Sequence, residues 1–181
     1  MLNKLLTSLL RLHAGAPGFR IYGKARPESH WRVIDVFASR RHNMDSFWPL
    51  MRGACVTWSD EVIVVGWDFA AIILREQQRN PASRESPIEV AGGRLSDAAR
   101  RLAVHAHSYF TASEVLAHEV GHTAQAIRLG AFYLPVVGSV TRFREGPHWW
   151  NHFENQASEQ GQFGGIVEGS VCAELRAMVQ E

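Results

Sequence analysis

Two histidines, His118 and His122, stand four residues apart around a glutamate in the sequence HEVGH. On a helix this spacing points both imidazoles from one face, about one turn apart, so that they can bind one metal ion. Glu119 follows the first histidine directly, and its carboxylate can lie beside a water on that metal and act as general base. The pattern H-E-x-x-H therefore predicts a zinc hydrolase site. The alternative is an amphipathic helix that carries two surface histidines.

The sequence around the two histidines has the signals of a complete helix. Thr111 and Glu114 have the spacing of a capping box at its start, and Gly130 suits the left-handed conformation that ends many helices. An apolar stripe at spacings of three and four residues comprises Leu116, Val120, Ala124 and Ile127. We therefore predict a capped helix that ends at Gly130, buries one face and presents the histidines from its middle.

A third metal ligand has to come from elsewhere, because a catalytic zinc ion takes three protein ligands and keeps one position open. Gln125 and Arg128 stand where the pattern H-E-x-x-H-x-x-G-x-x-H would have its glycine and its third histidine, so that subclass is excluded. We predict Glu154 as the third ligand, with Glu159 as the alternative. Asn151 and Glu154 also have capping-box spacing, so Glu154 could serve only as a cap of its own helix.

The residues after Glu154 complete a pattern E-x-x-A-S, in which Ala157 is small and Ser158 is polar. H-E-x-x-H followed by such a helix resembles the gluzincin metallopeptidases. The segments HEVGHTAQAIRLG and FENQAS also resemble small metallopeptidase-like domains in proteins linked to bacterial contractile injection systems. The resemblance covers about 115–160, or 53–160 with the preceding hairpin, and implies a zinc metallopeptidase. It departs from the family pattern at Ser158, where an acid or asparagine usually contacts a metal-bound histidine.

The predicted chemistry is the hydrolysis of a peptide bond by a zinc-activated water. Zinc held by His118, His122 and Glu154 would lower the pKa of its water, and Glu119 would take the proton and pass it to the leaving amine. For stabilisation of the oxyanion we predict His148. The other candidates for that role are Tyr109, Tyr133 and His152.

A peptidase of this kind needs a peptide or protein substrate, and 181 residues leave little room for a second lobe. We expect a cleft that is either shallow and open or completed by a partner protein. The competing hypothesis is a non-catalytic zinc-binding interaction or cargo module that retains the H-E-x-x-H fold. The presence of Glu119 favours the peptidase, because a structural metal site has no use for a general base.

The elements that position these residues indicate an α+β fold, in which a small antiparallel sheet or hairpin packs on a helical metallopeptidase core. The expected strands lie at 19–24, 32–38, 54–58 and 61–67, the last two forming a hairpin around Ser59-Asp60. The further expected helices lie at 1–13, 44–53, 95–110, 151–161 and 166–180. The apolar run 129–143 favours β-structure, and the run 68–78 fits either a strand or a helix.

Length and composition indicate one globular domain, 1–181, with an N-terminal amphipathic helix at 1–13 and a core at about 53–181. A formal net charge of +1 gives no electrostatic reason to expect nucleic acid as a partner. Arg11 and His13 interrupt the leucine-rich N-terminus, which argues against a signal peptide, and no apolar run reaches the length of a membrane span. We therefore expect no membrane contact, and a location in the cytoplasm or export without a cleavable signal peptide. Cys55 and Cys172 are expected to be reduced.

Overall fold

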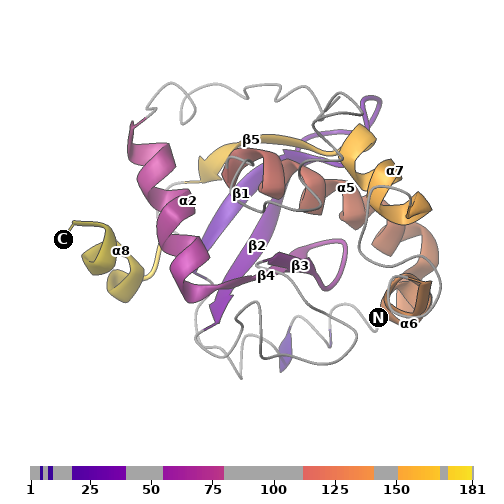
Figure 1. The fold of residues 1–181 in the computed structure, drawn as a ribbon, viewed down its shortest axis with the longest axis horizontal. Coiled ribbons are helices and arrows are strands. Elements are labelled where there is room, and N and C mark those ends of the chain that lie inside the picture. Colours follow the sequence, from indigo (N-terminus) through magenta and orange to yellow (C-terminus); the bar gives the residue numbers. More distant parts are fainter. Residues whose placement is uncertain are drawn as a thin grey trace.

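The computed structural model describes residues 5, 8, 9, 18–39, 55–79, 112–140, 151–167 and 171–180. In these residues the chain forms a five-stranded sheet with helices packed on it, so the predicted α+β class is confirmed (Figure 1). The strands are β1 (Phe19–Lys24), β2 (Arg32–Ser39), β3 (Cys55–Thr57), β4 (Val62–Gly66) and β5 (Gln162–Val167). The helices are α2 (Trp67–Arg79), α5 (Ala112–Leu129), the 3-10 turn η2 (Gly130–Phe132), α6 (Tyr133–Ser139), α7 (His152–Gln160) and α8 (Ala173–Gln180).

The sheet is mixed, whereas we expected an antiparallel one. Its strand order is β3-β4-β2-β1-β5, and the neighbours β2 and β4 run parallel. The other neighbouring pairs are antiparallel, including the predicted β3–β4 hairpin. A parallel pair needs a return connection between its two strands. The chain between β2 and β4, which includes the short strand β3, makes that connection.

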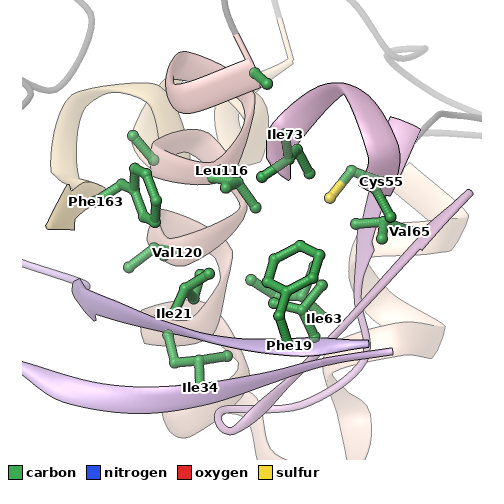
Figure 2. Packing of buried hydrophobic residues seen from close by; sticks show 14 of the residues in the cluster. Phe19, Ile21, Ile34, Cys55, Ile63, Val65, Ile73, Leu116, Val120 and Phe163 are labelled. Atoms are coloured by element: carbon green, nitrogen blue, oxygen red, sulfur yellow. The ribbon is translucent and has the colours of Figure 1, made fainter. Parts of the chain in front are cut away.

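The hydrophobic core lies between the sheet and helices α2 and α5. Figure 2 shows Leu116 and Val120 of α5 pointing onto strand residues that include Phe19 and Ile21, and these four side chains are fully buried. Burial of such a side chain stabilises the fold by about 1.5–3 kcal/mol. The strands β1 and β2 belong to this core, which therefore begins before residue 53.

The apolar stripe predicted for α5 is confirmed in three of its four positions. Leu116, Val120 and Ala124 are buried, but Ile127 is exposed. The helix also lies close to β1, since a Cβ atom added at Gly23 would be 2.8 Å from Val120 Cγ2. A glycine in this strand therefore lets the helix that carries the two histidines rest directly on the sheet.

Two predicted elements are wrong, and one open choice is settled. The run 68–78 is helical and belongs to α2. The run 129–143 is helical in its described part, η2 and α6, where we expected β-structure. Pro135 lies in the first turn of α6, where a missing backbone N–H is tolerated. The final helix begins at Ala173 and not near 166, because 162–167 forms β5 along β1.

Other expectations fall partly or wholly outside the described residues. Of the predicted helix 1–13, Leu5, Ser8 and Leu9 are described, and they are helical and exposed. The predicted helices 44–53 and 95–110 lie outside the described ranges. The two cysteines are free. Within the described ranges, no helix combines the length and the hydrophobicity that a bilayer crossing requires.

Candidate metal centre

His118 and His122 lie on α5, whose start and end are each defined by a specific local feature. At its start, the Ala112 N–H donates to Glu76 Oε2 of α2 at 2.9 Å, which places a carboxylate at the positive end of the helix dipole. At its end, Gly130 has a φ of +55°, so the predicted stop is confirmed. Thr111, the first residue of the predicted capping box, lies outside the described ranges. The N-terminus of α5 is thus tied to α2 across the core.

Helix α7 packs against α5 at a distance that only glycines allow. A Cβ atom added at Gly121 of α5 would lie 2.1 Å from the carbonyl oxygen of Ala157. A Cβ atom added at Gly161, directly after α7, would lie 1.6 Å from the carbonyl oxygen of Ala117. Because both glycines lack a side chain, the two backbones can approach closely. This close packing brings the first turn of α7 to the histidine face of α5.

The predicted ligands His118, His122 and Glu154 come together between these helices. His118 Nε2 lies 3.1 Å from His122 Nε2 and 3.0 Å from Glu154 Oε2. His122 Nε2 and Glu154 Oε2 are 3.4 Å apart. Atoms bound tetrahedrally to one zinc ion at about 2.0 Å are themselves about 3.3 Å apart. The three side chains therefore have a mutual spacing at which they could hold one metal ion.

Each histidine ring is also held at its other nitrogen. His118 Nδ1 lies 2.8 Å from Ser158 Oγ, and His122 Nδ1 lies 2.8 Å from Gln125 Oε1. Such contacts orient metal-binding imidazoles. Ser158, where the chain departs from the gluzincin pattern, thus still contacts a histidine. Both rings are oriented so that their Nε2 atoms face Glu154.

Glu119 lies beside this group and is held by the edge strand β3. Thr57 Oγ1 is 2.7 Å from Glu119 Oε2 and 2.8 Å from the Glu119 carbonyl oxygen. Its hydroxyl can donate to the carboxylate, which is buried between α5 and the sheet. Sequence reasoning missed Thr57. The available signal was weak, since a threonine in a three-residue strand gives no hint of a partner 62 residues away.

Tyr133, at the start of α6, is the described aromatic residue beside the histidines. Its ring centre lies 6.4 Å from that of His122, and the side chain is buried. Burial raises the pKa of the Tyr133 hydroxyl well above its usual value, and the charges of Glu119 and Glu154 add to this, while a hydrogen bond with Thr57 opposes it. The hydroxyl therefore stays protonated and can donate a hydrogen bond.

The neighbouring carboxylates control the protonation of His122 when no metal is bound. Burial by itself would lower the pKa of His122, but the charge of Glu154 and its hydrogen bond, with Glu119 and Gln125 adding to them, raise it to about 9. Burial would raise the pKa of Glu154, yet the two histidines lower it well below its usual value. In the metal-free protein His122 and Glu154 thus form an ion pair, and a metal ion must displace the proton on His122.

The structure separates the alternatives for the remaining site residues. Among the described residues, His118, His122 and Glu154 are the one group of three potential ligands that converges, with ligand atoms within 4.8 Å of one another. Glu159 is exposed and outside this group. Asn151 caps α7 with its side chain, which accepts a hydrogen bond from the N–H of Phe153, while the Glu154 carboxylate contacts both histidines.

Of the four candidates for oxyanion stabilisation, the structure describes Tyr133 and His152. The predicted residue, His148, lies outside the described ranges, as does Tyr109. His152 is exposed, with its ring 5.6 Å from that of Phe153. Tyr133 is the candidate that the structure places beside the histidines.

Comparison of the chain with protein families, curated proteins and solved structures gave no match.

Proposed function

We propose that the protein is a zinc-dependent metallopeptidase whose metal ion is bound by His118, His122 and Glu154. The observation that carries the proposal is the convergence of their ligand atoms at mutual distances of 3.0–3.4 Å beside Glu119. Solvent access supports a catalytic role. The side chains of His118 and Glu154 are 27% and 23% exposed, so one side of the site is open to water and substrate. Structural zinc sites, by contrast, take four protein ligands, and three converge here among the described residues.

The residues around the site fit the steps of peptide hydrolysis. A bound zinc ion would supply a Lewis acid for a peptide carbonyl and a lowered pKa for water. Glu119 would take a proton from that water at its carboxylate and donate it to the leaving nitrogen. Thr57 would hold this carboxylate by its hydroxyl hydrogen bond. Tyr133 would donate its hydroxyl hydrogen to the developing oxyanion, a role for which His148 is the alternative.

One observation favours the competing function, a non-catalytic zinc-binding interaction or cargo module. Glu119 is buried, and its carboxylate is engaged by Thr57. A glutamate held in this way could stabilise the contact between α5 and β3 without reacting with anything. In that case the metal would join α5 to α7, and Glu119 would matter for folding only.

The deciding experiment compares the wild type with Glu119→Gln for metal content and for cleavage of a mixed peptide library. Both proteins should bind one equivalent of zinc, because Glu119 is not a ligand. Cleavage should fall at least a hundredfold in Glu119→Gln, since general acid–base catalysis contributes about 10²–10⁴-fold. Glu159→Gln makes the same chemical change at an exposed position of α7 and should leave both properties unchanged.

The other outcomes separate the remaining hypotheses. A wild type that binds zinc but cleaves no peptide would favour the non-catalytic module. A wild type that binds no metal would refute both functions. Loss of metal in Glu159→Gln, together with full metal binding in Glu154→Gln, would move the third ligand to Glu159.

A further inference from the structure

Gln125 is a buried amide that touches both helices of the candidate metal centre. Its Oε1 lies 2.8 Å from His122 Nδ1 on α5. Its Nε2 donates to the Phe153 carbonyl oxygen of α7 at 2.8 Å, and it lies 3.2 Å from Gln156 Oε1. The side chain is only 3% exposed, so these contacts have little competition from water. Phe153 directly precedes Glu154, so one amide reaches a ligand of α5 and the turn that carries the ligand of α7.

The chemistry of these partners determines which way the amide points. A backbone carbonyl can only accept, so the atom that faces Phe153 must be the amide nitrogen. The amide oxygen then faces His122 and can only accept, so His122 Nδ1 must carry a hydrogen. The lone pair of the neutral ring is therefore on Nε2, the atom that faces His118 and Glu154. Gln125 thus selects the metal-binding tautomer of His122.

We propose that Gln125 is a positioning residue that couples the orientation of His122 to the placement of Glu154 in the metal centre. It bonds to the ring and to the first turn of α7 at the same time, so neither can move without disturbing the other. Ser158 of α7 also reaches α5 through its bond to His118, but it lies one turn beyond Glu154, whereas Gln125 bonds to the residue directly before Glu154. This inference rests on the metal site of the proposed function but not on proteolysis, and its test measures metal binding alone.

Gln125→Glu tests whether Gln125 links His122 to α7 or only orients the His122 ring. A glutamate can accept the hydrogen of His122 Nδ1, and more strongly than an amide. It cannot donate to the Phe153 carbonyl, and two oxygens at that distance would repel each other. We expect the affinity for Zn²⁺, measured by competition with a chromophoric chelator, to fall at least tenfold, within the range known for such supporting residues. The visible absorption of bound Co²⁺ should shift toward that of Glu154→Gln. An unchanged or higher Zn²⁺ affinity would overturn the proposal.

A second variant keeps the test decisive if the buried glutamate prevents folding. Gln125→Met has a similar volume and removes both hydrogen bonds. If Gln125 acts through α7, Glu154→Gln should lower the Zn²⁺ affinity by a smaller factor in the Gln125→Met background than in the wild type. Glu159→Gln, at an exposed position of α7, is the control, and its effect should multiply with that of Glu154→Gln.

The contrary results fall into two classes. The role of Gln125 would be refuted if the effects of Gln125→Met and Glu154→Gln on Zn²⁺ affinity simply multiply. It would also be refuted if Glu159→Gln couples to Glu154→Gln as strongly as Gln125→Met does. A wild type that binds neither Zn²⁺ nor Co²⁺ would refute the metal centre itself and this inference with it.

Discussion

Gly121→Ala is expected to move Glu154 away from His118 and His122 without changing any of these three side chains. The new methyl group would start 2.1 Å from the Ala157 carbonyl oxygen, and an ordinary contact requires at least 3.4 Å. The obstacle is backbone, so α5 and α7 must separate by about 1.3 Å to remove the overlap. Glu154 moves with α7, whereas His118 and His122 stay with α5. Metal–ligand distances vary by only about 0.2 Å, so this displacement takes Glu154 out of the coordination sphere.

The expected result is a large loss of metal affinity with a modest change in stability. Overpacking costs about 1–3 kcal/mol, and alanine recovers up to about 1 kcal/mol of helix propensity relative to glycine. The metal-free variant should therefore fold, with a free energy of unfolding lowered by about 2 kcal/mol or less. Loss of Glu154 as a ligand should reduce Zn²⁺ affinity at least a hundredfold, more than the 10–100-fold that outer contacts contribute.

Chemical denaturation of the metal-free protein and chelator competition with Zn²⁺ measure the two quantities separately. Gly130→Ala is the matched control, because a Cβ atom there meets nothing within 4 Å while the φ of +55° is unfavourable for alanine. It should lower stability by about 1–2 kcal/mol and leave the Zn²⁺ affinity unchanged. Wild-type affinity in Gly121→Ala would refute the idea that the contact between α5 and α7 sets the ligand spacing.

Two further predictions concern protons and the general base. Because the pKa of His122 is raised to about 9, its ring is protonated at pH 7.5 in the metal-free protein, and Zn²⁺ binding should release this proton as well as the one that a zinc-bound water loses. Calorimetry in buffers of different ionisation enthalpy should show the total release fall by about one proton as the pH rises past about 9, and a constant release across that range would contradict the prediction. Thr57→Val should lower kcat for peptide cleavage about tenfold or more with zinc content unchanged, since a hydrogen bond to a charged group contributes about 1.5–3 kcal/mol. Thr57→Ser should recover most of kcat, and equal kcat values for the two variants would exclude a role for the hydroxyl.

The sequence predicts those parts of the site that depend on local signals. The stop at Gly130, the stripe of Leu116 and Val120, and the pairing of His118 with His122 all follow from helical periodicity and backbone preference. These signals extend over fewer than about twenty residues, so one chain is enough to read them.

The parts that could not be predicted depend on contacts between distant segments. The prediction of Glu154 had to leave Glu159 as an alternative, because the choice depends on the closeness of α5 and α7, which Gly121 and Gly161 set jointly. The strand β5 contains two adjacent glycines, which are rare in strands and weaken the sequence signal for one. It forms through its long-range pairing with β1. The contact of Thr57 with Glu119 likewise depends on how β3 meets α5.

The direct passage from α7 to β5 has a consequence for the order of folding. Only Gly161 separates the helix that carries Glu154 from the strand that pairs with β1. The paired residues of β1 and β5 lie about 140 residues apart in the chain, so this closure is slow compared with the formation of local elements. Because β5 follows α7 after one residue, this pairing also fixes where α7 and Glu154 lie relative to the sheet. The centre should therefore assemble in a late folding step, and partly folded chains should carry both histidines without a complete set of metal ligands.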